Sequence, residues 1–396
     1  MFDMYDVIIV GARCAGASTA LSLARQGVRV LLVDRAGFPS DTVSTHLLHA
    51  AGVAQLKEWG LLEPLLSGGC PPIGTIGFQP ADDLVLRGTP YPYDGVSISL
   101  APRRTVLDAL LVETAVAAGA ELRERVSFQN AVWDGGRVVG AEFVSGGRRF
   151  VERAALVVGA DGRRSSVARS VGADVVRDAG SFGCQFYGYW GGLPDEGARV
   201  FVGGGQAVLA YPTHGGDHLV LVGWPRTRLA EVRQDIDRHF LAAVAAKAPV
   251  VREYLTDDAR SGRIAGSGDL GNFVRASSGP GWVLVGDAAT AKDAVTAQGI
   301  GDAFSQARSL AVRLPAALAA GPAAVDAATA DHVADRDRDG ASAFATTVAF
   351  ATGGNADAMP TLFRAIQGRP DLVSMFFGVY AGRVTFAELV AAVDGL

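Results

Sequence analysis

The chain opens with a strand, turn, helix and strand pattern. Tyr5 to Val10 is a short β-branched apolar run, a glycine-containing turn follows, and apolar positions then recur at helical spacing as far as Ala24. Val28 to Val33 repeats the strand pattern. This order within about 30 residues predicts a βαβ unit, whose parallel strands are buried on both faces. We therefore expect an α/β fold.

The later segments alternate between this pattern and a second, sheet-rich one. Aromatic and β-branched runs broken by Gly, Pro and His predict antiparallel strands over residues 182–224. The remaining predictions are a helix at 105–119, strands at 121–131, 137–144, 156–159 and 283–285, a helix at 303–318, and an Ala-rich helical appendage over 323–396. Because the buried-strand pattern returns late, the βαβ unit is predicted to be discontinuous and interleaved with an antiparallel-sheet unit.

Composition and charge exclude several classes of protein. Hydrophobic residues make up 49% of the 396 residues and charged residues 19%, which favours a globular chain over a disordered one. The net charge of −5 offers no positive field for a phosphate backbone, so no nucleic acid partner is expected. The sequence also predicts no membrane span, because its longest uncharged stretches are interrupted by polar residues and glycine.

Cysteine and histidine usage predicts neither a disulfide framework nor a metal site. Three scattered cysteines are too few for either and fit a reducing cytoplasm. The histidine pairs His46/His49 and His214/His218 lack the further ligands that a metal requires. The N-terminal residues carry acids where a secretory signal needs basic residues, so a cytoplasmic location is expected.

The first turn carries the features of a dinucleotide site. Gly11 permits a tight turn after the first strand, and Gly16 permits the helix to pack closely on that strand. The N-terminus of the helix presents N–H groups to a pyrophosphate, and Asp34 at the end of the next strand can accept hydrogen bonds from a ribose. Arg13 replaces the usual middle glycine and places a guanidinium near a phosphate.

A second glycine-rich segment, Gly266 to Gly271, matches Gly-x-Gly-x-x-Gly at every position. No buried strand precedes it and no helix follows it. We therefore predict a glycine-rich surface loop there and no dinucleotide site.

Two further segments place acids at the ends of predicted strands. The first runs from Gly159 to Arg169 (GADGRRSSVAR) and contains an Asp-Gly turn signal. The second runs from Gly279 to Ala289 (GPGWVLVGDAA), and Thr296 to Ile300 (TAQGI) then leads into a helix whose N–H groups can face an anion.

Together and in this order, the segments resemble the flavoprotein monooxygenase superfamily with the para-hydroxybenzoate hydroxylase fold, which also holds geranylgeranyl reductases and flavin-dependent halogenases. The resemblance implies an FAD-binding domain at 1–68, 101–175 and 270–330, a substrate domain at 69–100 and 176–269, and a C-terminal helical region at 331–396. The chain departs from the family pattern at Thr290 and Ala294 and lacks a Trp-x-Trp-x-Ile-Pro halogenase signature.

The resemblance also implies which residues contact FAD. The first turn binds the pyrophosphate, Asp34 binds the adenosine ribose, the Asp-Gly segment serves FAD and NAD(P)H, Asp287 binds the ribityl chain, and the loop before the late helix lies along the isoalloxazine. The implied contacts are Gly11, Arg13, Cys14, Ala15, Gly16, Asp34, Arg35, Ser44, Thr45, Arg104, Val126, Asp161, Gly162, Ser165, Gly286, Asp287, Ala297, Gln298, Gly299 and Ile300.

The implied activity is monooxygenation of an aromatic or apolar small molecule. NADPH or NADH reduces FAD, and O2 then forms a flavin C4a-hydroperoxide that oxygenates the substrate. Since one dinucleotide unit is predicted, nicotinamide binds transiently or a separate flavin reductase supplies the electrons. Two alternatives stay open: reduction or desaturation of a prenyl-like or polyketide substrate, and a non-redox cyclisation in which FAD is structural.

Few side chains are predicted to act on the substrate directly. His46 lies in the segment that runs beside the flavin in this family and is the candidate catalytic residue. Phe186, Tyr211 and Trp224 belong to an aromatic set that either lines a substrate pocket or builds a sheet core, because both environments use the same residue types. We take these three as the candidate substrate contacts.

Overall fold

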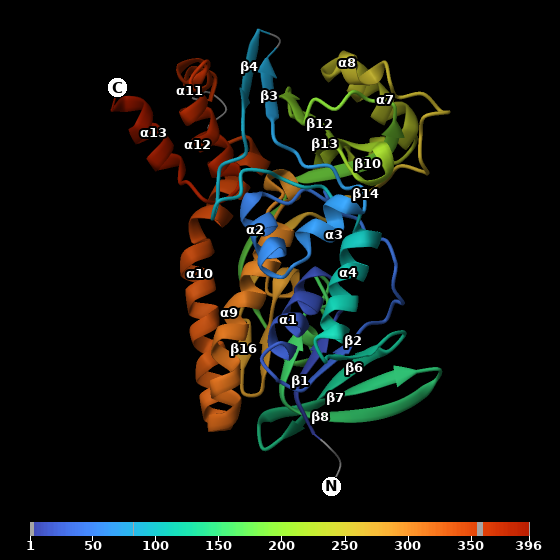
Figure 1. The fold of residues 1–396 in the computed structure, drawn as a ribbon, viewed down its shortest axis with the longest axis vertical. Coiled ribbons are helices and arrows are strands. Elements are labelled where there is room, and N and C mark those ends of the chain that lie inside the picture. The colour runs from blue at the N-terminus through green and yellow to red at the C-terminus, as the bar shows by residue number, and fades with distance from the viewer. Residues whose placement is uncertain (1–3, 82, 355–358, 396) are drawn as a thin grey trace.

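The computed structural model describes residues 4–81, 83–354 and 359–395, which form two sheet-based units and a group of C-terminal helices (Figure 1). The predicted domain ranges also include residues 1–3, 82, 355–358 and 396, which lie outside the described residues.

An eight-stranded sheet forms the first unit. Its parallel strands lie in the order β5-β2-β1-β8-β17, with β16 antiparallel at one edge and β6 and β7 extending from β8. The bounds are β1 Tyr5–Val10, β2 Val30–Val33, β5 Glu121–Arg123, β6 Ser127–Asp134, β7 Arg137–Ser145, β8 Arg148–Gly159, β16 Ser278–Gly279 and β17 Trp282–Leu284. Val7, Ile8 and Ile9 of β1 have no exposed surface, as expected of a parallel strand covered on both faces.

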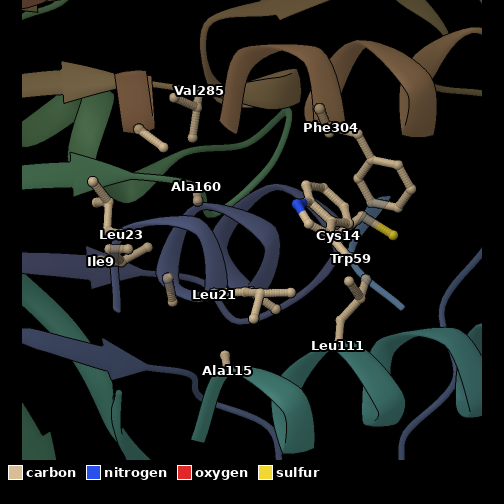
Figure 2. Close-up of a cluster of buried hydrophobic side chains, with 14 of the residues drawn as sticks. Ile9, Cys14, Leu21, Leu23, Trp59, Leu111, Ala115, Ala160, Val285 and Phe304 are labelled. Carbon is tan, nitrogen blue, oxygen red and sulfur yellow. The ribbon is translucent and has the colours of Figure 1, made fainter. Parts of the chain in front are cut away.

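Three helices pack around the first strand-to-helix connection. They are α1 Cys14–Ala24, α4 Arg104–Ala117 and α9 Gly299–Ala320. Figure 2 shows α1, which carries Leu21, between α4 with Leu111 and α9 with Phe304. Nearly every residue of α1 is buried, so this helix is held inside the unit by its neighbours rather than by one amphipathic face.

A seven-stranded sheet forms the second unit. Its order is β14-β10-β13-β12-β11-β3-β4, and all neighbours are antiparallel except β11 and β3. The bounds are β3 Ile76–Ala81, β4 Leu84–Gly88, β10 Gly183–Gly191, β11 Ala198–Gly203, β12 Gln206–Pro212, β13 Asp217–Pro225 and β14 Ala265–Ser267. Helices α6 Leu229–Val232, α7 Ile236–Lys247 and α8 Pro249–Arg252 cover one face, and the other face turns toward the first unit.

Smaller elements connect the two units. They are α2 Ala50–Glu58, α3 Leu62–Ser67, α5 Ser166–Ser170, a three-stranded sheet of β9 Val175–Ser181, β15 Gly271–Arg275 and β18 Thr290–Ala291, and the 3-10 turns η1 His214–Gly216, η2 Arg226–Arg228, η3 Gly286–Ala288 and η4 Ala294–Thr296. Both η3 and η4 lie in the connection between β17 and α9.

The C-terminal helices pack against both units. Helix α10 Pro322–Thr352 lies along α9, while α11 Met359–Ile366, α12 Pro370–Tyr380 and α13 Phe386–Asp394 pack on the β3–β4 hairpin through Phe78 and Phe376 (Figure 1). The predicted boundary at residue 331 falls inside α10. The boundary between α9 and α10 lies ten residues earlier. Gly321 there has a φ of 103°, and Pro322 is the first residue of α10.

Two other predictions need correction. The strand expected at 121–131 is broken, because the N–H groups of Arg125 and Val126 bond back to Ala36 and Asp34 after β2. The loop expected at 266–271 is instead a turn between two short strands, and β14 pairs with β10 in the seven-stranded sheet. That pairing is a contact between distant segments, which local pattern does not reveal.

Candidate active site

A cavity of about 1020 Å³ lies between the two units. The ends of β1 and β2, the turns after β8 and β17 and the start of α9 form one side, and Gln185, Tyr187 and Leu221 of the seven-stranded sheet form the other. Ligand sites in open α/β sheets form at the carboxyl ends of the strands. The cavity therefore combines such a site with a second wall from a different unit.

The first turn is closed tightly around its two glycines. Gly11 has a φ of 100°, and a Cβ there would lie 2.5 Å from the carbonyl oxygen of Ala160. A Cβ on Gly16 would lie 1.7 Å from the carbonyl oxygen of Gly11. Helix α1 begins with no side-chain cap and no acid in its first turn, so its first N–H groups are available to an anion in the cavity.

The end of β2 places a carboxylate beside this turn. Asp34 Oδ2 accepts from the N–H of Ala12 at 2.7 Å, and its Oδ1 accepts from the N–H of Ala36 at 2.7 Å. Each oxygen keeps a further lone pair for a ligand. Arg35 and Val126 line the same end of the cavity, which can hold a hydroxyl-rich group.

The Asp-Gly segment caps a helix at the cavity wall. Asp161 Oδ2 accepts from the N–H of Ser166 at 2.6 Å, and its Oδ1 accepts from the hydroxyl of Ser165. Ser165 Oγ in turn accepts from the N–H of Ala168 at 2.9 Å, which makes Ser165 the N-cap of α5. Asp161 and Gly162 line the cavity. Ser165 is buried behind them, so the structure places it as a support and not as a direct contact.

A second acid lies at the end of β17. Asp287 Oδ2 is 3.7 Å from Arg163 Nη2 and borders the cavity beside Gly286, whose φ is 60°. The N–H of Gly286 donates to Gln306 Oε1 of α9 at 2.7 Å. Enclosure by the cavity walls raises the pKa of Asp287, and Arg163 opposes this effect.

The loop before α9 is held from two sides. Ala297 has a φ of 51°, and Ala297, Gln298, Gly299 and Ile300 all line the cavity. Gln298 Oε1 accepts from Lys292 Nζ, and Gln298 Nε2 donates to the carbonyl oxygen of Tyr380 at 2.7 Å.

Two more contacts reach this loop from distant segments. Thr296 Oγ1 lies 2.9 Å from Thr347 Oγ1 of α10, and His49 Nε2 lies 2.8 Å from the carbonyl oxygen of Thr296. Sequence analysis missed Thr347, Tyr380 and the role of His49, because no local pattern links these positions.

Comparison with known proteins identifies the family of this chain. Residues 4–336 match the family described as FAD binding domain. The chain belongs to this family. The protein is an FAD-dependent oxidoreductase, and its fold is that of the flavoprotein monooxygenases and halogenases.

Similar proteins include both a reductase and a monooxygenase. The chain is 27% identical over 343 residues to digeranylgeranylglycerophospholipid reductase of Methanosarcina mazei, a match that covers 82% of this chain and 78% of the reductase. It is also 27% identical over 313 residues to 6-methylpretetramide 4-monooxygenase of Streptomyces rimosus, covering 76% and 73% of the two chains.

Solved structures agree on the fold. The flavin-dependent brominase Bmp2 has a TM-score of 0.84 at 17% identity and covers 99% of both chains. PqsL of Pseudomonas aeruginosa has a TM-score of 0.78 at 22% identity, covering 91% of this chain and all of PqsL.

The cavity of this FAD-dependent oxidoreductase fits its cofactor. The uncapped start of α1 suits a pyrophosphate, and the two glycines leave no room for side chains where the turn closes. Asp34 and Asp287 offer acceptors to sugar hydroxyls at separate points of the same wall.

Behind the first turn, a buried carboxylate joins α1 to α4. Asp108 accepts from Arg104 Nε at 3.0 Å and Nη2 at 2.9 Å, from Arg13 Nη1 at 2.8 Å, and from Cys14 Sγ at 3.2 Å. Arg13 also donates to Ser40 and to the carbonyl oxygen of Asp41. The guanidinium that sequence analysis assigned to a phosphate is thus already paired. Burial raises the pKa of the Cys14 thiol far above its ordinary value.

His46 lies just behind the cavity wall. Ser44, Thr45 and Leu47 line the cavity, while His46 has no exposed surface and a φ of 64°. Its Nδ1 is 2.8 Å from the carbonyl oxygen of Ser44, so Nδ1 carries the proton and Nε2 accepts from the Tyr189 hydroxyl at 2.7 Å. Burial lowers the pKa of His46 to about 4, so the imidazole is neutral at pH 7.

The predicted substrate contacts lie elsewhere. Phe186 and Trp224 pack edge to face, with ring centroids 6.1 Å apart, in the cluster under α7, on the sheet face opposite the cavity. Side chains alternate along a strand, so Gln185 and Tyr187, the neighbours of Phe186 on β10, face the cavity instead. Tyr211 is on the cavity side, but it is buried and donates to the carbonyl oxygen of Thr45.

Two absences hold for the part of the chain that is described. No group of three or more His, Cys, Asp or Glu side chains in these residues could hold a metal ion. No helix among residues 4–81, 83–354 and 359–395 combines the length and the apolar character needed to cross a bilayer.

Proposed function

We propose that this oxidoreductase is a monooxygenase. NADPH or NADH supplies two electrons, one atom of O2 enters an aromatic or apolar small molecule, and the other leaves as water. The observation that supports this proposal most directly is a single cavity. It extends from the turn before α1 to the uncharged wall of Gln185, Tyr187 and Leu221. A substrate on that wall shares one cavity with the cofactor, which holds the two reactants close together.

FAD, when bound, supplies the electron transfer and the activation of O2. The residues of this chain bind and orient it. In our proposal, the first N–H groups of α1 hold the pyrophosphate, Asp34 and Val126 hold the adenosine part, and Asp287 holds the ribityl chain. Arg104 supports this arrangement through Asp108, which fixes the start of α1.

The start of α9 stabilises negative charge at the reacting end. Gly299 and Ile300 line the cavity at the N-terminus of a 22-residue helix that has no side-chain cap. The partial positive charge of such a terminus favours an anionic ring system nearby. Gln298, clamped between Lys292 and Tyr380, fixes the loop that leads into this helix.

His46 is a positioning residue in this scheme. Its neutral Nε2 accepts a hydrogen bond from the Tyr189 hydroxyl, and its ring centroid lies 5.4 Å from that of Tyr187, which borders the cavity. The imidazole therefore fixes Tyr189 through a hydrogen bond and packs against Tyr187 at the substrate wall.

A second candidate function is reduction of a prenyl-like or polyketide substrate without oxygen insertion. The match to a digeranylgeranylglycerophospholipid reductase over 82% of this chain favours it. In either case, a separate flavin reductase is the alternative to direct reduction by a nicotinamide.

Anaerobic spectroscopy followed by isotope labelling tests the proposal. We expect the flavin absorbance to bleach with NADPH or NADH, and labelled O2 admitted with a substrate to place one labelled atom in the product. A product that gains two hydrogen atoms and no label would establish the reductase instead. A flavin that bleaches only after a flavin reductase is added would assign the electrons to that partner.

A further inference from the structure

Two polar groups beside the cavity, the Gln185 amide and Asp293 Oδ2, have no hydrogen-bond partner in the described structure. Gln185 of β10 lines the cavity, and its amide bonds to no other described residue. Asp293, in the loop before η4, also lines the cavity, and its Oδ2 is buried without a hydrogen bond. Buried polar groups in folded proteins are nearly always paired, so an unpaired acceptor at a cavity points to a ligand.

The rest of Asp293 is firmly held. Its Oδ1 accepts from the N–H of Val295 at 3.0 Å and caps η4, while its own N–H donates to Asn272 Oδ1 at 2.7 Å. Only 4% of its surface is exposed. Oδ2 is therefore a fixed acceptor rather than the end of a mobile side chain.

Two glycines leave space beside these groups. A Cβ on Gly183 would lie 3.2 Å from Asp293 Oδ2, and Gly223, the cross-strand partner of Gln185, leaves the amide uncovered. Gly183 and Gln185 are two residues apart on β10, so they share a face and lie about 7 Å apart. The Gln185 side chain and Asp293 Oδ2 therefore lie on the same face of β10.

The charges around the cavity disfavour an anionic substrate. Arg13 and Arg104 bond to Asp108, Arg163 lies by Asp287, Arg164 bonds to Asp269 and Lys292 bonds to Asp302. The remaining lining cation, Arg35, follows β2 in the other sheet, beside Asp34. A carboxylate placed against Gln185 would meet the unpaired Asp293 and no free cation, and burying an unpaired charge is costly.

We propose that Gln185 and Asp293 form a hydroxyl-binding subsite, and that the substrate is an uncharged, largely apolar molecule that carries a hydroxyl group. The hydroxyl donates to Asp293 Oδ2 and accepts from the Gln185 amide. This inference rests on the proposed function, since it assumes that the substrate binds in the FAD cavity.

Three ring-matched probes test the subsite in the FAD-loaded chain: 2-naphthol, 2-methoxynaphthalene, which cannot donate, and 2-naphthoate, which is anionic. Each is titrated while the visible spectrum of the bound flavin is recorded. We expect 2-naphthol to bind at least about tenfold more tightly than either other probe, because a site built to bind a hydroxyl rejects analogues that lack it. Equal affinities, tighter binding of 2-naphthoate, or no spectral change with any probe would overturn the inference.

Two variants assign the preference to these side chains. Asp293→Asn keeps an oxygen to cap η4 but replaces the free acceptor with a donor, and Gln185→Leu removes the amide at similar volume. Each should lower the ratio of 2-naphthol to 2-methoxynaphthalene affinity to near one. Gln234→Leu, the same exchange at an exposed position outside the cavity, should leave that ratio unchanged. Ratios unaltered in both polar variants would contradict the assignment.

The controls separate this inference from the proposed function. FAD content is measured first, and reduction by NADPH is measured without any probe. A chain that bleaches with NADPH but shows no hydroxyl preference loses only the subsite. A chain that shows the preference but inserts no oxygen keeps the subsite and loses the monooxygenase assignment.

Discussion

Two glycine-rich segments of this chain look alike in sequence and differ in structure. Gly266 to Gly271 matches the dinucleotide pattern fully, yet it forms a turn between β14 and β15. Gly11 to Gly16 has Arg13 at the middle glycine position, yet it leads from β1 directly into α1. The N-terminus of a helix, and not the spacing of glycines alone, is what provides N–H groups for a phosphate.

Each segment also carries an arginine–aspartate pair, and the pairs differ in burial. Asp108 is fully buried and joins Arg13 to Arg104 at 9% exposure. Asp269 is half exposed, and its partner Arg164 is 83% exposed. The first pair lies behind the turn that we propose binds the cofactor, whereas the second is a surface contact at the rim of the cavity.

The largest expected effect comes from adding one methyl group to each segment. In Gly16→Ala, the new Cβ would meet the carbonyl oxygen of Gly11 at 1.7 Å, so the turn cannot close and FAD should be lost. In Gly268→Ala, the Cβ would meet the flexible side chain of Leu229, which can move. The measurement is bound FAD per chain, with circular dichroism as a check of folding. Equal loss of FAD in both variants would contradict the conclusion that only the first segment binds the cofactor.

Removing the carboxylate of each pair should change the stability of the protein by different amounts. Asp108→Asn leaves a buried guanidinium without its anion and should lower the free energy of unfolding by about 3–5 kcal/mol. Asp269→Asn breaks an exposed pair and should lower it by about 0–1 kcal/mol. Urea unfolding measures both. Similar losses of unfolding free energy in the two variants would mean that the buried Asp108 ion pairs do not stabilise the first segment.

A smaller effect is expected from His46, which supports the wall facing the first segment. Its pKa is lowered from 6.5 to about 4, so the folded state binds fewer protons than the unfolded state in this range. Stability from this group is therefore complete above pH 6.5 and falls as the pH drops toward 4, by about 3 kcal/mol.

The matched variant for this prediction is His46→Gln, which cannot titrate. Unfolding by urea at pH 7 and pH 4.5 should show a smaller loss of stability on acidification in the variant than in the native chain. The other buried histidines act equally on both proteins. An identical loss in the two would show that His46 is not held neutral.

The smallest effect concerns the loop before α9. Thr347→Val removes the hydroxyl that lies 2.9 Å from Thr296 Oγ1, and this should cost about 1 kcal/mol in the free energy of unfolding. If α10 positions the loop, the flavin absorbance bands should shift as well. A stability loss with an unchanged flavin spectrum would limit α10 to a packing role.

The cofactor side of the cavity was predictable because its signals are local. A strand, a tight turn and a helix follow one another within a few residues around Gly11, and the same holds around Asp161. The finer role of Ser165 was not predictable, because capping α5 and touching a ligand need the same residue type in the same turn.

The substrate side was less predictable, because a shift of one residue along a strand moves every side chain to the opposite face of the sheet. Phe186 and Trp224 face α7, whereas Gln185 and Tyr187, their neighbours, face the cavity. Asp108, Thr347 and Tyr380 act through contacts between distant segments. A single sequence carries no signal for such pairs.

The most direct test of the account is a crystal structure of the chain purified with FAD. We predict the pyrophosphate against the N–H groups between Gly11 and Gly16, Asp34 beside the adenosine ribose, and the isoalloxazine along Ala297 to Ile300. Density for the pyrophosphate at Gly266 to Gly271, or outside the cavity between the two units, would contradict it.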